Sequence, residues 1–206
     1  MKRTSLSATA VGLAVLSPLA SARGVSPYLP LNMSPEIERQ IERVLILGDK
    51  PILARPIAAA TVLDALPAAC RIDRELCSSV RTFLSRYMRK LNIDHASLEG
   101  AEADDSQRPI PNRYGEPVGS AWHASAGAHW QVNDYAILSL GGVAYEDEAV
   151  PTGSMVSVGF DWAQLDVGYR PHWYSPFTES AMLLSTEAQT LQSVTLSNYT
   201  PLTSLG

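Results

Sequence analysis

The chain has 206 residues, of which 46% are hydrophobic, and a formal net charge of −5 at neutral pH. This length permits one or two domains, and the hydrophobic fraction is enough for a conventional core. The acidic balance argues against nucleic acid as a partner. Beyond the first residues, no apolar stretch extends for ~20 positions without Gly, Ser or a charged residue, so no transmembrane helix is expected.

Residues 1–22 are predicted to be a secretory signal peptide. Two basic residues follow the initiator Met, Leu6–Leu16 is apolar, Pro18 interrupts it, and Ala20-Ser21-Ala22 is a small-x-small cleavage site. The alternatives are a buried helix or a membrane anchor, but the apolar run is too short to span ~30 Å of hydrocarbon. Cleavage removes the two basic residues, so the mature exported chain carries a formal charge of −7.

Residues 23–98 are predicted to form a helical plug. In its first helix, Ser34-Pro35-Glu36 supplies an N-cap, a proline at the first helical position and an acid at the positive end of the helix dipole. This helix is amphipathic and is expected to stop at Gly48 and Pro51. Its apolar positions are Ile37, Ile41, Val44 and Leu45.

Two further helices are predicted before a linker. A short helix is expected over residues 59–66, ended by Pro67, and Asp73 is expected to cap a third. The apolar positions of the third recur at three- and four-residue steps, at Leu76, Val80, Phe83, Leu84, Tyr87 and Leu91. Residues 99–118 are acidic and rich in Pro, Gly and Asn, which predicts a linker.

Cys70 and Cys77 are predicted to form one disulfide, because the compartment is oxidising and the number of cysteines is even. The alternatives are two free buried thiols or a metal site, although no second pair of ligands lies at a usable spacing. The bridge is expected to clamp the incoming loop to the start of the third helix. On the chain-entropy model it contributes roughly 2 to 3 kcal/mol.

After Gly119 the period of the apolar residues changes from about 3.6 to 2, which predicts β-strands. Trp122–Val132 separates clearly into two faces, and 155–162 and 164–170 repeat the division, whereas 135–145 is apolar on both faces. One face of the first strand holds Trp122, Ala124, Ala126, Ala128, Trp130 and Val132. The other holds His123, Ser125, Gly127, His129 and Gln131.

Strands that are apolar on one face, small or polar on the other and aromatic near their ends are typical of transmembrane β-barrels. The predicted connections alternate between short (133–134 and around 163) and long (147–153 and 171–180), which favours the same fold. The alternative is an exported antiparallel sandwich, which would bury its apolar face. About five strands fit within residues 119–206, fewer than the eight of the smallest barrels, so we expect either the front of a longer protein or a truncated reading frame.

The predicted fold class is therefore α+β, with a helical plug followed by the first antiparallel strands of an incomplete transmembrane β-barrel. We expect no cofactor and no metal site. The histidines are His95, His123, His129 and His172. They are scattered, and His123 and His129 share a strand face but lie about 20 Å apart at the rise of a strand, too far to share a metal ion.

Other polar motifs do not predict catalysis either, so we expect no enzyme. The acidic runs 104–105 and 146–148 lack the alternating ligands of a calcium loop, and no G-x-S-x-G elbow occurs. Trp173 and Tyr174 are weak candidates for stacking on a sugar ring, because aromatics on exposed loops of a β scaffold can do so. The alternative is an aromatic belt at the membrane interface.

Several segments resemble the capsule assembly Wzi family. The N-terminal similarity lies in Leu29–Arg43, Lys50-Pro51-Ile52 and Arg55-Pro56. The later similarity lies in Trp122, Gly141-Gly142, Gln164–Arg170, Trp173–Pro176 and Leu196–Tyr199. The resemblance spans nearly all of the mature chain, but family members are more than twice as long and contain most of a barrel that is missing here.

The resemblance implies a protein in the outer membrane of a Gram-negative bacterium, with a helical bundle at the periplasmic end of a barrel that is monomeric at full length. Such proteins help to attach capsular polysaccharide or exopolysaccharide to the cell surface, binding glycan as a lectin without breaking a bond. The expected partners are this polysaccharide and outer-membrane lipid. The alternatives are an exported barrel enzyme or channel acting on polysaccharide, and a soluble periplasmic domain of helices and sheet.

Overall fold

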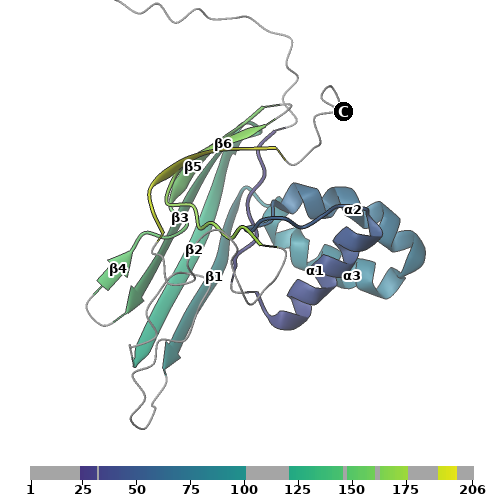
Figure 1. Ribbon diagram of the computed structural model, residues 1–206, viewed down its shortest axis with the longest axis horizontal. Coiled ribbons are helices and arrows are strands. Elements are labelled where there is room, and N and C mark those ends of the chain that lie inside the picture. Colours follow the sequence, from purple (N-terminus) through teal and green to yellow (C-terminus); the bar gives the residue numbers. More distant parts are fainter. Residues whose placement is uncertain are drawn as a thin grey trace, which may run out of the picture.

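The computed structural model describes residues 24–31, 33–100, 121–145, 148–160, 163–175 and 190–198. The predicted signal peptide and nearly all of the predicted linker fall outside these residues. Figure 1 shows three helices gathered into a bundle on one side of a long antiparallel sheet. The fold class of the described residues is α+β, as the sequence predicts.

The bundle contains α1 (Pro35–Leu47), α2 (Ala59–Ile72) and α3 (Arg74–Leu84), followed by the short 3-10 helix η1 (Ser85–Met88). The predicted caps are confirmed, because the Ser34 hydroxyl accepts from the Ile37 amide and the Asp73 carboxylate from the Leu76 amide. α1 ends at Gly48, as predicted. The apolar faces of the helices point toward one another and form the hydrophobic core.

The predicted end of the second helix at Pro67 is wrong, since α2 continues through this proline to Ile72. A proline inside a helix removes one backbone hydrogen bond, but Pro67 is exposed and the alanines that follow favour helix. Cys70 consequently lies in the last turn of α2 rather than in a loop.

The predicted disulfide between Cys70 and Cys77 is confirmed, and it joins the last turn of α2 to the first turn of α3. We expect replacement of both cysteines by serine to lower the free energy of unfolding by about 2 kcal/mol. The loss is of this size because the disulfide closes a short loop, so removing it gives the unfolded chain only a limited gain in conformational entropy. Urea denaturation with and without reductant measures this. Unchanged stability of the double variant would contradict it, and reductant should not affect that variant.

The sheet contains β1 (Leu91–Gly100), β2 (Trp122–Asn133), β3 (Ala136–Tyr145), β4 (Glu148–Val150), β5 (Met155–Gly159), β6 (Gln164–Gly168) and β7 (Ser193–Ser197). Its order is β1-β2-β3-β5-β6-β7, and the short β4 pairs with the far end of β3. All pairs are antiparallel, and along this path each strand pairs with the one that follows it in the chain, except that β3 pairs with β5 across the intervening β4. Within the described residues the sheet is not closed, and β1 and β7 are its edges.

The sheet corrects the sequence prediction at two places. Leu91–Gly100 is the edge strand β1, so the helical segment ends at Met88 rather than near residue 98. Its alternation is interrupted by an irregularity between Ile93 and His95, which places two consecutive polar residues on one face and hides the period of 2. The predicted long loop 147–153 also contains β4, so the described part of residues 119–206 holds six strands, β2–β7, where about five were expected.

The core lies in the bundle and not against the sheet. It is formed by residues of the helices together with Leu29 and Ile57 from the adjoining segments, and none of its members lies on a described strand. The bundle instead faces the polar side of the sheet. Residues 24–31, which we call the strap, run between the two, and Figure 1 shows them in purple along the sheet. The sheet therefore has one face that the strap and the bundle cover and an opposite face with many exposed side chains.

Candidate functional site

One face of the sheet, here called the outer face, is apolar on every strand of its main path. The pairing register assigns to it Leu, Ile, Val, Ala, Trp and Gly, together with Asn133 beside the β2–β3 turn. Its most exposed large side chains are Leu91, Ile93, Leu98, Trp130, Leu140, Val156, Val194 and Leu196. A contiguous apolar surface of this kind on a soluble protein is unusual, because it is costly to leave in water.

Tryptophans mark both ends of the outer face of β2. Trp122 and Trp130 are 41% and 51% exposed, and eight residues of strand separate them by roughly 27 Å at the usual rise. Tyr135 and Phe160 are also exposed, and both adjoin the short turns at the Trp130 end. This spacing matches the ~25 Å apolar band between aromatic girdles of a transmembrane sheet.

The opposite face, here called the inner face, is largely buried. It is polar on β1, β2, β6 and β7, whereas on β3 and β5 it also carries the buried residues Ile137, Val143, Tyr145 and Met155. Its residues on β2 include Ser125 and His129, both nearly inaccessible. His129 Nδ1 lies 2.7 Å from the Asp94 carboxylate on β1, and its ring stacks on Tyr87 of η1 with the centroids 6.1 Å apart. Burial raises the pKa of Tyr87 well above its usual value, so its hydroxyl stays protonated. The bundle therefore touches the sheet through polar side chains.

The strap is fixed to the inner face by backbone hydrogen bonds. The Val25 amide donates to the Asp134 carbonyl at the β2–β3 turn, 2.8 Å away. The Ser26 amide donates to Gln164 Oε1 on β6 at 2.9 Å, and the Ser26 hydroxyl accepts from the Ala60 amide of α2. Gln164 is completely buried. One short segment thus joins two turns of the sheet to the bundle.

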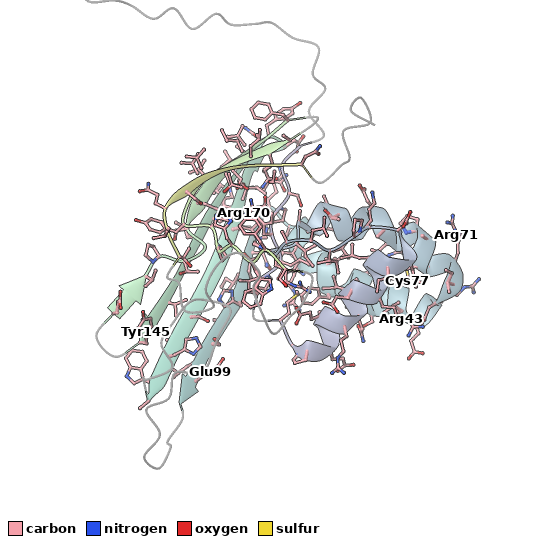
Figure 2. All side chains as sticks on the ribbon, in the orientation of Figure 1. Arg43, Arg71, Cys77, Glu99, Tyr145 and Arg170 are labelled. Carbon is pink, nitrogen blue, oxygen red and sulfur yellow. A yellow bond between two sulfur atoms is a disulfide. The ribbon has the colours of Figure 1, made fainter. Side chains whose placement is uncertain are left out.

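A buried network continues from Gln164 to Arg170. Gln164 Nε2 donates to one oxygen of the Asp166 carboxylate, while the other oxygen accepts from the Tyr28 hydroxyl at 2.7 Å and from Arg170 Nη1 at 3.3 Å. The Arg170 guanidinium lies over the Tyr28 ring. Burial raises the pKa of Tyr28, which keeps its hydroxyl a donor. Figure 2 places Arg170 between sheet and bundle.

A second ionic contact joins the bundle to the segment after β6. Arg55 has a side chain only 2% exposed, with Nε 3.3 Å from the Glu38 carboxylate, and it also pairs with Glu42. Its Nη1 donates to the Ser175 carbonyl, and its backbone exchanges two hydrogen bonds with Trp173. Glu38 and Glu42 lie outside the apolar positions of α1, and the periodicity of the helix does not reveal this partner.

The close approach of the strap to β5 requires glycine at position 159. A Cβ there would lie 2.5 Å from the carbonyl of Gly24. We expect Gly159→Ala to push the strap away from the sheet and to lower the free energy of unfolding by about 1 to 3 kcal/mol. Gly142→Ala is the control, since its nearest contact is 3.5 Å away. Chemical denaturation compares the two, and equal stabilities would contradict a packed strap.

The aromatic candidates from the sequence lie in different environments. Trp173 is 3% exposed and pairs with Arg55 through its backbone, whereas Tyr174 is 37% exposed. The Tyr174 ring stacks on His172, whose Nε2 lies 3.0 Å from the Ser193 hydroxyl. Of these two candidates, Tyr174 has the ring that is accessible to a ligand in this conformation. The sugar-binding role of the two aromatics stays a prediction.

The four histidines are not brought together. His95, His123 and His129 lie along the inner face, and His172 follows β6. Among the described residues, no group of three His, Cys, Asp or Glu side chains could hold a metal ion. The same residues include no helix that is long and apolar enough to cross a membrane. No family model, curated protein or solved structure matches the chain.

Sequence reasoning assigned no contact role to several residues that join the bundle, the strap and the sheet. Ser26, Tyr28, Arg55, Gln164 and Asp166 are ordinary polar residues when taken one at a time. The sequence nevertheless contained a signal for two of them, because Gln164 and Asp166 occupy the polar positions of an alternating strand. Both are almost fully buried, which periodicity cannot reveal because it does not show what covers a face.

Proposed function

We propose that the described sheet is part of the wall of an outer-membrane β-barrel, and that the protein helps to attach capsular polysaccharide or exopolysaccharide to the surface of a Gram-negative cell. The observation that carries the membrane part is the outer face, which has no charged side chain on the main path of the sheet; its hydrogen-bonding side chains are those of Trp122, Trp130 and Asn133, which lie toward the ends of β2. Lipid tails are the solvent that suits such a face.

The division between the two faces supports the barrel over a soluble sandwich. A sandwich packs its apolar face on a second layer, yet the bundle covers the polar face and keeps its own core. The edge strands β1 and β7 need partners inside a bilayer, because no lipid group satisfies their backbone amides and carbonyls. In the proposed barrel, strands other than those of the described sheet supply this pairing.

The arrangement of the turns supports an orientation. Short connections follow β2 and β5, and the strap is fixed at the β2–β3 turn, near the end where η1 leads into β1. Barrels have short turns on the periplasmic side and longer loops outside. We therefore assign the bundle to the periplasmic end. There the bundle acts as a plug that contacts the inner face of the proposed barrel wall through polar side chains.

The glycan part of the proposal rests on the resemblance to the capsule assembly Wzi family. Segments quoted for that resemblance meet at the contact between plug and sheet, where Arg55 joins Trp173 and Ser175, and Gln164 and Asp166 join Arg170. A binding role needs no catalytic group. The protein is thus proposed to anchor polysaccharide rather than to modify it.

A deletion strain tests the function. We expect the protein in the outer-membrane fraction after carbonate washing, and we expect deletion to release polysaccharide into the medium while total polysaccharide stays the same. Recovery of the protein in the soluble periplasmic fraction would overturn the membrane part. Unchanged cell-bound polysaccharide would overturn attachment. Shortened or chemically altered polysaccharide would favour an enzyme instead.

A further inference from the structure

A cavity of about 350 Å³ lies between the bundle and the C-terminal edge of the sheet. Its lining includes Tyr28 of the strap, Arg170, residues 50–54 and 56–58 of the connection between α1 and α2, and Ser197 and Asn198 at the end of β7. Cavities of this size hold small ligands. The network of Tyr28, Asp166 and Arg170 borders it without filling it.

The charge of this cavity is opposite to that of the chain. The described residues that line it include two cations, Lys50 and Arg170, and no acid, whereas the whole chain carries −5. Asp166 does not line the cavity, but its carboxylate pairs with Arg170 and balances part of the Arg170 charge. The ammonium of Lys50 is partly exposed and forms no ion pair with any described residue. An anion entering the cavity would meet a net positive surface.

Arg170 provides the second observation. Its side chain is 9% exposed, and one guanidinium nitrogen is engaged by Asp166. Its Nε is buried and has no hydrogen-bond partner among the described residues. A buried donor without a partner costs free energy, and a small adjustment of this side chain toward a carboxylate would satisfy it. Arginine favours such planar partners because it donates two parallel hydrogen bonds.

The remaining lining fits a hydroxylated ring better than a bare ion. Thr61, Ser197 and Asn198 add hydroxyl and amide groups to the lining. Much of the rest is apolar and includes Pro51, Ile52, Leu53, Pro56 and Ile57. Pyranose rings present hydroxyls at their edge and C–H groups on their faces, so a lining with both kinds of group suits them. A free phosphate would leave the apolar lining without a partner.

We propose that this cavity binds the carboxylate of an acidic sugar, with Lys50 and Arg170 as the cationic contacts. The proposal rests on the proposed function for the view that the ligand is a saccharide, and it adds that the saccharide is a uronic acid or another carboxylated sugar. Ser197 pairs with Gln164 beside the short β5–β6 turn, so the site lies at the periplasmic end of the proposed barrel.

The test is titration of the full chain, folded in detergent, with D-glucuronate, D-glucose or inorganic phosphate, followed by calorimetry. We expect glucuronate to bind at least tenfold more tightly than glucose, and Lys50→Gln to weaken glucuronate about fivefold to tenfold. Lys90→Gln is the matched control, since Lys90 is exposed and lies outside the cavity. Lys50 is chosen because its replacement leaves the Arg170–Asp166 pair in place.

Three results would overturn this proposal: no binding of glucuronate, equal affinity of Lys50→Gln and the unaltered chain, or phosphate binding as tight as glucuronate. The last would indicate a general anion site. These results leave the attachment function intact if the deletion strain still releases polysaccharide. Conversely, glucuronate could bind tightly while deletion of the protein releases no polysaccharide. This result would support the binding site and overturn the attachment function.

Discussion

Leu140→Arg is expected to prevent the protein from integrating into the outer membrane. Leu140 lies on the outer face of β3 and is 62% exposed. An arginine facing lipid near the middle of a barrel wall costs about 2 to 4 kcal/mol, whereas the same exposed position in water tolerates arginine within about 0.5 kcal/mol. The measurement is the fraction of protein that resists extraction by carbonate, which we expect to fall more than tenfold.

Ile46→Arg is the matched control, because Ile46 is also a large apolar residue with high exposure, 73%, and lies on α1. It lies on the bundle, outside the proposed lipid surface, so this variant should integrate like the unaltered chain. If Leu140→Arg integrates equally well, the outer face does not meet lipid. A loss for both variants would mean that added charge, rather than its position, is responsible.

The second large effect is expected from Arg55→Met. This change removes the cation that faces Glu38 and Glu42 while keeping an aliphatic side chain of similar length. Glu38 is 7% exposed at its side chain, so its charge would remain in a poorly solvated site. Breaking a buried pair from one side costs about 3 to 5 kcal/mol. We expect a loss of this size in urea denaturation followed by circular dichroism.

Two further variants test the cause. Arg43→Met removes a surface pair with Asp73, in which the arginine side chain is 64% exposed, and should cost less than about 1 kcal/mol. The double variant Arg55→Met with Glu38→Met removes the buried charge itself and should recover most of the loss. If Arg55→Met is as stable as Arg43→Met, the contact between bundle and sheet does not depend on this ion pair.

The fold shows which sequence signals were sufficient. Capping by Ser34 and Asp73 and the alternation of β2 are local, because each depends on residues within one turn or one strand. The signals that misled were also local. Pro67 suggested a helix end that the packed bundle overrides, and the irregularity after Ile93 hid the period of β1.

The sequence by itself determined that a helical part precedes a strand part, as well as the disulfide and the two faces of β2, since periodicity, capping and cysteine number are read within short segments. Only the tertiary structure decided that the polar face is the covered one. That outcome depends on Ser26 meeting Gln164 and Arg55 meeting Ser175, pairs separated by 138 and 120 residues. Such contacts leave no local pattern, because their partners become neighbours only when the strap and the segment after β6 fold onto the sheet.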